Sequence, residues 1–504
     1  MTEVGISKTH YTMSDSNPAV VPKKFILPFI LVTTLFALWG FANDITNPLV
    51  AVFKDVFVID NKQSTWVQMA FYGGYATMAI PAALFIRKFS YKMGILIGLG
   101  LYAVGAFISI PAAGGANFNL FIVSLYVITF GLAFLETTAN PYILSMGDPK
   151  TSTLRLNLAQ AFNPIGSLSG MFIAGTVILS SIQVEDFKTD VGAALADKNP
   201  AAVEQSEHKI LPFLQSKPRE VKGDENVKAY VAELPAGEGD VNTALSDFKD
   251  GKIASYQGQS HAEFQKTDLK TVSMPYVVIG CVVLVMFFVF LFSKMPSTSK
   301  ADDEGDDPFG QVLSRLVSNP RYVGGVIAQI FYVGAQIMVW TFIIQYAENE
   351  LGIDKATAQN HNIMAMVLFL SFRFIFTGLL KFVSPGALLA VLSMVATAAT
   401  LGAIYLEGMT GLYSLVAISV CMSVMFPTIY GLALGGTGSD AKLGSAGLIL
   451  AIVGGAFMPR LQGQIMDLDG FMGTTATRGS FYLPVICFVV ITIYGLMCFK
   501  KKDA

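Results

Sequence analysis

Charged residues are scarce in this sequence. Asp, Glu, Lys and Arg together make up 14% of its 504 residues, whereas a soluble domain carries roughly 25%. Hydrophobic residues make up 53%, and the mean hydropathy is +0.55. The formal net charge of -2 lacks the positive excess that a nucleic-acid partner requires. The composition therefore predicts a membrane protein and argues against a nucleic-acid partner.

Cysteine and histidine are also rare, with four of each. The cysteines lie in apolar runs without paired spacing, which indicates buried small hydrophobes rather than disulfides or metal ligands. The histidines avoid the centres of these runs, which argues against a histidine proton relay. No Gly-rich nucleotide-binding loop, zinc-binding helix motif or Gly-x-Ser-x-Gly elbow is present. We therefore expect no enzyme, no ATP-driven pump, no cofactor and no metal.

Long apolar runs account for most of the chain. A membrane-spanning helix needs about 20 mainly apolar residues. Such runs lie near residues 25–50, 64–86, 92–112, 118–146, 154–181, 272–294, 322–346, 357–381, 385–406, 410–435, 443–466 and 480–499. These two sets of six predict an all-α membrane protein with twelve transmembrane helices in two six-helix bundles.

Polar segments divide the chain between these runs. The expected parts are an N-terminal tail (1–24), helices 1–5 of the first bundle (25–181), an insertion (182–271), helix 6 (272–294), a linker (295–321), the second bundle (322–499) and a C-terminal tail (500–504). The first tail has no apolar core of a cleavable signal peptide. The insertion is far longer than a loop requires. A small folded cap and a mostly disordered segment are both compatible with its composition.

The short loops carry most of their positive charges on one side. That side holds Lys23, Lys24, Arg87, Lys88, Lys92, Lys150, Arg155, Lys294, Lys300, Arg315, Arg321, Lys381, Lys442 and 500–502. The other side has only Lys54, Lys62, Lys355 and Arg478 in its short loops. Cytoplasmic loops carry such an excess of Lys and Arg. We therefore expect both termini and the linker in the cytoplasm, and the insertion on the outer face.

The two halves of the sequence share a pattern of proline, glycine and small residues. Pro141 lies within the fourth apolar run and Pro427 within the tenth, and a Gly-containing exit and a small-residue-rich helix follow each of them. Either proline alone would be a tolerated packing kink. Interrupted helices at corresponding places in two halves indicate a binding site between them, near the membrane midplane.

Two carboxylates lie where lipid or protein interior is expected. Asp44 is in the first run and Glu136 is in the fourth, and neither has a Lys or Arg at helical spacing within its own run. A charge inside a membrane is costly, so each is a candidate functional residue. An unpaired buried carboxylate can carry and release a proton. The alternative is a structural carboxylate that accepts hydrogen bonds from a neighbouring helix.

Amides and aromatic residues share helix faces with these carboxylates. The sets at helical spacing are Asn43 with Asn47, Glu136 with Asn140, Gln160 with Asn163, and Gln329, Tyr332, Gln336 and Trp340. Sugar hydroxyls pair with amides and carboxylates, and an aromatic ring covers the apolar face of a sugar. Any single amide could instead join two helices. Arg373 and Arg460 are expected to be structural, Arg373 because it can extend toward the cytoplasmic end.

At these residues the chain resembles the fucose–proton symporter family of the major facilitator superfamily. The resemblance is carried by Leu38–Asp44, Phe134–Pro141, Leu154–Asn163, Phe331–Gln336 and Phe426–Tyr430. It implies the major facilitator fold and the uptake of a hexose or 6-deoxyhexose, with L-fucose as the best guess, by proton symport through alternating access. It also implies a multi-pass protein of the bacterial cytoplasmic (inner) membrane that works as a monomer among lipids.

The resemblance also implies roles for single residues. Glu136 matches one membrane carboxylate of the family, and Asp44 matches the other unless Asn47 takes its place. Gln160 and Asn163 match polar residues of the sugar cavity, and Tyr430 ends a matching segment. The proton would bind Asp44 or Glu136. We expect the sugar to bind Asn43, Asn47, Glu136, Asn140, Gln160, Asn163, Gln329, Gln336, Trp340 and Tyr430.

Other functions remain open at this point. The same family fold suits glucose, galactose or N-acetylglucosamine, because these sugars differ from fucose at only a few positions. A protein that senses a sugar without transporting it is a second alternative. A drug–proton antiporter is a third, and the amide-rich faces argue against it.

Overall fold

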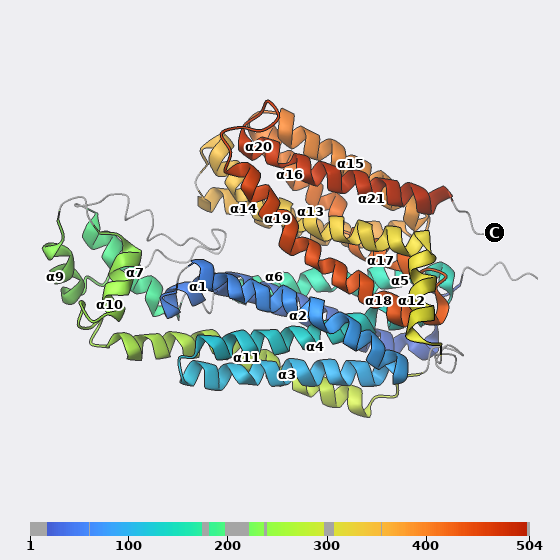
Figure 1. Cartoon of the computed structure of the whole chain (residues 1–504), viewed down its shortest axis with the longest axis horizontal. Coiled ribbons are helices and arrows are strands. Elements are labelled where there is room, and N and C mark those ends of the chain that lie inside the picture. The colour runs from blue at the N-terminus through green and yellow to red at the C-terminus, as the bar shows by residue number, and fades with distance from the viewer. Residues whose placement is uncertain are drawn as a thin grey trace, which may run out of the picture.

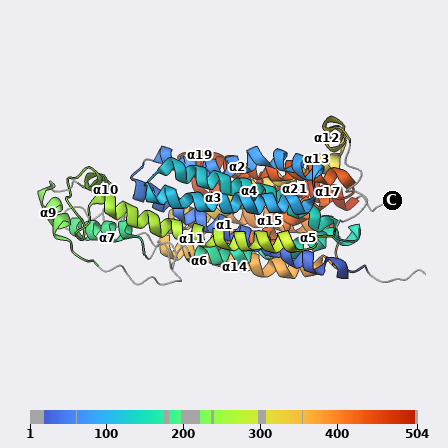
Figure 2. The same ribbon diagram turned by 90° about the horizontal axis from the view of Figure 1, so that it is seen from below.

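The structure is a computed structural model. It describes residues 18–59, 61–173, 181–196, 221–235, 239–296, 307–353 and 355–500. Every named element in these ranges is a helix. Two helical bundles lie side by side, and a smaller group of helices projects beyond one end of the first bundle (Figure 1). Seen from below, the two bundles overlap and the smaller group of helices again projects beyond their end (Figure 2).

The first bundle contains six long elements. They are α1 (Ile26–Phe57), α2 (Asn61–Lys88), α3 (Tyr91–Gly114), α4 (Phe118–Ser145), the pair α5 (Ser152–Gln160) and α6 (Asn163–Ile173), and α11 (His261–Phe292). Ser90 and Asn117 begin α3 and α4, because each side chain accepts a hydrogen bond from a backbone N–H of the first turn. Gly166 lets α6 approach α1 closely, since a Cβ there would overlap the backbone oxygen of Ala37.

The second bundle repeats this pattern. It contains α13 (Pro320–Leu351), α14 (Lys355–Leu379), α15 (Pro385–Tyr405), the pair α16 (Met409–Met422) and α17 (Met425–Leu434), the pair α18 (Ala441–Leu450) and α19 (Gly454–Met466), and the pair α20 (Ala476–Ser480) and α21 (Tyr482–Lys500). Within the described ranges, eleven helical stretches are long and apolar enough to cross a membrane. The expected run 154–181 is the twelfth, and its described residues form α5 and α6 as far as Ile173.

The helix breaks differ from the paired kinks that the two prolines predict. Pro141 lies inside α4, which remains one helix. Pro427 lies in the first turn of α17, after α16 has ended at Met422. Proline lacks a backbone N–H and is tolerated in a first turn, where no intrahelical partner is needed. The clear interruption in the first half lies instead between α5 and α6, at Ala161 and Phe162, and Pro164 lies in the first turn of α6.

The described part of the insertion is a folded helical cap. We use "cap" for α7 (Gln183–Leu195), α9 (Glu225–Glu233), α10 (Val241–Lys249) and the first turns of α11. Its core contains Phe187 and Phe248, whose rings stack 5.1 Å apart, with the rings of Tyr256 and Phe264 packed edge-on against Phe187. Of the two alternatives for the insertion, these residues adopt the folded one. Helix α11 begins at His261, earlier than the expected 272, because Ser260 and Glu263 form a capping box.

Carboxylates organise the interior of the cap. Asp268 accepts hydrogen bonds of 2.8 Å from the backbone N–H groups of Gln183 and Val184, which fixes the start of α7 against α11. Asp247 accepts hydrogen bonds from Lys252 Nζ (2.8 Å) and Tyr230 OH (2.6 Å). These contacts hold helices that are too short to be stable alone in water.

Three cap side chains hold the end of α1. Lys188 of α7 forms a 2.7 Å ion pair with Asp55, and both side chains are buried, at 3% and 9% exposure. Gln265 of α11 donates to the Val56 carbonyl at 2.8 Å. Lys249 of α10 donates to the Phe57 carbonyl at 3.4 Å. The last carbonyls of a helix have no intrahelical partner, so the cap supplies what α1 leaves unpaired.

The linker contains a short helix, α12 (Phe309–Ser318), at the end of the molecule opposite the cap (Figure 1). Arg315 of α12 makes a bidentate contact with Asp440 before α18, at 2.7 and 2.8 Å. The same guanidinium is 2.8 Å from the carboxylate of Asp307. Arg87 at the end of α2 donates to the Asp307 carbonyl at 2.6 Å. The linker therefore connects the two bundles through hydrogen bonds as well as through the chain.

Candidate functional site

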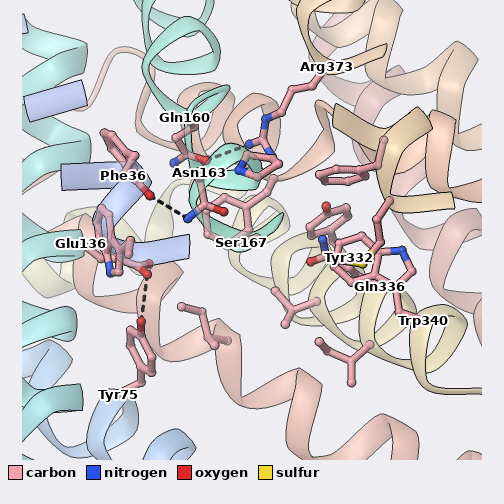
Figure 3. A pocket seen from close by; sticks show the side chains of 18 of the residues that line it. Phe36, Tyr75, Glu136, Gln160, Asn163, Ser167, Tyr332, Gln336, Trp340 and Arg373 are labelled. Atoms are coloured by element: carbon pink, nitrogen blue, oxygen red, sulfur yellow. Dashed lines mark hydrogen bonds between the residues drawn. The ribbon is translucent and has the colours of Figure 1, made fainter. Parts of the chain in front are cut away.

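A cavity of about 230 Å³ lies between the two bundles. Drug-sized ligands occupy pockets of roughly 300–1,000 Å³, so this cavity suits a smaller molecule such as a single sugar ring. Helices α1, α2, α4, α5 and α6 line it on one side, and α13, α14, α17 and the turn that contains Ile452 line it on the other. Figure 3 shows most of these side chains. Its polar lining residues are Tyr75, Glu136, Asn140, Gln160, Asn163, Ser167, Tyr332, Gln336 and Arg373, and its aromatic residues include Phe36, Trp39, Phe71, Tyr72, Trp340, Phe369 and Phe426.

Glu136 of α4 reaches the cavity from the first bundle. Its Oε1 accepts a 3.1 Å hydrogen bond from the hydroxyl of Tyr75 on α2 (Figure 3). Among the described residues, no lysine or arginine forms an ion pair with this carboxylate. This carboxylate is half-buried between helices and has only a neutral hydrogen-bond partner, so it costs less to enclose when it carries a proton than when it is charged. The sequence did not single out Tyr75, because tyrosines are common in membrane helices and the contact joins residues 61 positions apart.

The amides of the first bundle lie at the break between α5 and α6. Gln160 ends α5 and donates to Asn140 Oδ1 at 2.9 Å, and Asn163 begins α6 and donates to the Phe36 carbonyl at 3.1 Å. A helix break frees space and leaves backbone groups unpaired, so polar side chains suit this position. The structure thus brings Glu136, Asn140, Gln160 and Asn163 to one cavity.

Arg373 differs from the expectation of a structural residue that extends toward the cytoplasmic end. It lies in the cavity lining on α14 and is only 4% exposed. Its Nη2 donates to Gln160 Oε1 across the two bundles at 3.3 Å (Figure 3). Its guanidinium carbon lies 5.5 Å from the ring centre of Phe369, within cation–π range. Spacing along α14 allowed both orientations, and only the packing of the helix decides between them.

The second bundle supplies Gln336 and Trp340 from α13. The Trp340 indole N–H donates to Ser419 Oγ at 3.2 Å, which fixes the ring. Tyr332, one turn before Gln336, donates its hydroxyl to the Met422 carbonyl at 3.1 Å. Its phenol oxygen is therefore already paired.

Other predicted site residues are not part of this lining. Gln329 and Tyr430 are fully buried, and neither lines the cavity. Gln329 precedes Gln336 by about two turns of α13, so it shares the face of Gln336 at a different depth. Asn43, Asp44 and Asn47 belong to α1, but their side chains lie outside the described residues.

The two bundles meet closely at the end of the cavity that points away from the cap. Asn157 of α5 donates to Thr428 Oγ1 of α17 at 3.2 Å. Ser445 of α18 donates to the Thr137 carbonyl of α4 at 3.1 Å. We call this contact region the inner interface. In Figure 1, α5, α17 and α18 lie together at the end of the bundles opposite the cap.

The arrangement suits a polar, uncharged ligand. Amide groups and one guanidinium can pair with hydroxyls, and Trp39 and Trp340 offer flat apolar faces from opposite bundles. Glu136 adds a group that can change its charge by one proton. A site between two pseudo-equivalent bundles is also the place where an alternating-access carrier holds its substrate.

The comparisons with known proteins agree with this description. A sequence profile described as the Major Facilitator Superfamily matches residues 30–184. The chain is 47% identical over 484 residues to a protein named L-fucose-proton symporter from Haemophilus influenzae, covering 96% of this chain and 99% of that one. It is 31% identical to the L-fucose-proton symporter of Escherichia coli, covering 94% and 93%.

The fold matches as well. A crystal structure of the major facilitator transporter FucP in the outward conformation superposes with a TM-score of 0.75 at 29% identity, covering 94% of this chain and 99% of that chain. The cavity between two six-helix bundles, the full-length identity and this superposition point to one conclusion. The chain is a multi-pass membrane transporter, not an enzyme, and it belongs to the L-fucose–proton symporter family of the major facilitator superfamily.

Proposed function

We propose that this protein imports L-fucose together with a proton by alternating access. The observation that carries the proposal is the half-buried Glu136, which has a neutral hydrogen-bond partner and shares one cavity with sugar-pairing amides. A carboxylate that gains a proton becomes uncharged, and an uncharged group costs less to enclose. Protonation therefore favours closure of the cavity around its contents.

The bundles are in contact at the inner interface, so the described conformation is one that receives sugar from the opposite side. Sugar enters from the side of the cap, which we place outside the cell, with both termini in the cytoplasm. This placement follows from the positive charges of the short loops. We further propose that the protein acts as a monomer in the bacterial cytoplasmic membrane.

Within the cavity, Asn140, Gln160, Asn163 and Gln336 pair with sugar hydroxyls. Arg373 joins them as a donor, since its guanidinium has five N–H groups and its described side-chain hydrogen bond goes to Gln160. Trp39 and Trp340 cover the apolar faces of the sugar. Glu136 carries the coupled proton, and Asp44 is the second candidate for that role.

After sugar and proton have bound, the two bundles rotate relative to each other. The inner interface then parts, and sugar and proton leave into the cytoplasm. The return of the empty carrier completes the cycle. Each ligand shifts the equilibrium only by the difference in its affinity for the two states.

The test is uptake of radiolabelled L-fucose into proteoliposomes, with and without an inward proton gradient. For one proton per sugar, a gradient of one pH unit supports about tenfold accumulation, because one unit corresponds to about 1.36 kcal/mol. Unlabelled fucose should compete, and galactose and glucose should not. If galactose or glucose competes as strongly as fucose does, the transported substrate is not specifically L-fucose and the proposal changes to those sugars.

A pair of variants tests the carboxylate. Glu136→Gln should lose gradient-driven accumulation and keep fucose exchange without a gradient, because glutamine imitates the protonated form. Glu407→Gln is the matched control, since Glu407 is exposed outside the cavity. Normal accumulation by Glu136→Gln would remove Glu136 from the coupling role. Fucose binding without any flux in the unaltered protein would favour a sensor instead.

A further inference from the structure

The polar residues of α5 and α6 continue beyond the cavity. Asn163 and Gln160 line the cavity, and Asn157 lies about one turn before Gln160 on α5, on nearly the same face. The three amides therefore form a line that begins in the cavity and ends at the inner interface. Asn157 is 0% exposed in this conformation.

Asn157 is only partly paired at the closed interface. Its Nδ2 donates to the Thr153 carbonyl at 2.9 Å and to Thr428 Oγ1 at 3.2 Å. Its Oδ1 has no hydrogen-bond partner, although it is buried. An unpaired buried acceptor destabilises the state that contains it. The amide is therefore better satisfied in a state that brings it water or a ligand.

Neighbouring groups between the cavity and this interface show the same pattern. Asn140 Nδ2 and Thr137 Oγ1 on α4 are buried without hydrogen-bond partners. Thr137 is also the residue whose carbonyl receives the cross-bundle bond from Ser445. An interface that only had to close tightly would gain more from apolar side chains, because paired apolar surfaces leave no polar atom unsatisfied.

We propose that Asn157 binds the sugar in the inward-open state, as an inner subsite on the path to the cytoplasm. This inference rests on the proposed sugar–proton symport. When the bundles part, the bond to Thr428 breaks and the whole amide of Asn157 faces the opening. The sugar then passes from Gln160 to Asn157 as it leaves, and it exchanges one amide partner for the next.

The competing explanation is that Asn157 merely closes the interface through its bond to Thr428. The two explanations predict opposite signs for one quantity. A weaker closure raises the population of the inward-open state. The apparent affinity for sugar on the inner side then rises, since it scales with the competent fraction. Loss of a binding residue lowers that affinity.

The experiment compares Asn157→Ala with Thr428→Val in right-side-out membrane vesicles. Thr428→Val removes the cross-bundle bond and keeps the amide, whereas Asn157→Ala removes both. We would measure the KM for fucose uptake from outside and the KM for fucose efflux from preloaded vesicles, without a pH gradient. Asn157→Ser retains one hydroxyl, and it serves as a second variant if the alanine variant fails to reach the membrane.

We expect Asn157→Ala to raise the efflux KM about threefold to tenfold, the effect of one lost hydrogen bond, with a smaller increase for Asn157→Ser. Thr428→Val should lower the efflux KM or leave it unchanged, and it should raise the uptake KM. If Asn157→Ala behaves as Thr428→Val does, Asn157 is part of the closure only and the inference is wrong. If the unaltered protein moves no fucose in either direction, the proposed function itself fails.

Discussion

Replacing Lys188 by Met should release the cap from the membrane bundles. Lys188 and Asp55 form a 2.7 Å ion pair whose side chains are 3% and 9% exposed. Removing one partner leaves the other charge buried without compensation, which costs roughly 3–5 kcal/mol. Since about 1.4 kcal/mol corresponds to a factor of ten, the ratio of docked to undocked cap should fall by about two to three and a half orders of magnitude.

The double variant Lys188→Met with Asp55→Leu separates this cost from a loss of shape. Replacing both members of a buried pair by apolar residues of similar size is often neutral or stabilising. We therefore expect the double variant to recover most of the docking that the single variant loses. Lys228→Met is the control, because Lys228 pairs with Glu225 at side-chain exposures of 55% and 88%. Such surface pairs contribute roughly 0–1 kcal/mol.

Limited proteolysis of the purified protein in nanodiscs measures the undocked population. When opening is fast relative to cleavage, the cleavage rate follows the equilibrium between docked and undocked forms. The cap of Lys188→Met should be cut far faster than that of the unaltered protein, and Lys228→Met should be indistinguishable from it. Cleavage of Lys188→Met at the unaltered rate would refute the reasoning. A double variant as labile as the single one would show that shape, not charge, holds the cap.

Three further results are expected. Arg373→Met should raise the KM for fucose uptake about tenfold or more with normal expression, because the variant lacks a charged hydrogen-bond donor in the cavity. An unchanged KM would mean that Arg373 has only a structural role. Gly166→Ala should abolish monodisperse protein in fluorescence-detected size-exclusion chromatography, because its Cβ would overlap the backbone of α1, whereas Gly378→Ala, with open space around it, should not. Burial alone would raise the pKa of Asp247, but its hydrogen bonds from a lysine and a tyrosine outweigh burial and lower that pKa. Asp247 therefore stabilises the cap above its unfolded pKa and ceases to do so as pH falls below about 4. Proteolysis rates of Asp247→Asn and the unaltered protein should differ at neutral pH and converge in acid.

The bundles were predictable because each span carries its own signal. An apolar run of the required length is visible without any knowledge of its neighbours, and the carboxylate of Glu136 stands out inside such a run. Pairs of residues at helical spacing, such as Gln160 with Asn163, also reveal a shared face. These are local properties of the chain, and they led to most of the polar residues that line the cavity.

Properties that depend on packing were not predictable in the same way. The rotation of α14 decides whether Arg373 points into the cavity, and residue spacing does not fix that rotation. The depth of a residue along α13 decides that Gln336 lines the cavity and Gln329 does not. Lys188 and Asp55, which form an ion pair, are 133 residues apart in the chain, and neither local sequence indicates this contact.

The anchoring of the cap has a mechanical consequence. Its three anchors all hold the end of α1, and α11 continues from the cap into the first bundle. The cap is thus attached to the first bundle and moves with it when the two bundles rotate relative to each other. Because the cap projects beyond the end of the bundles (Figure 1), a rotation of the first bundle by a few degrees displaces the outer end of the cap more than it displaces the bundle itself. A binding protein that contacts both the cap and the second bundle would restrict the rotation of the first bundle. It would therefore slow transport without entering the cavity.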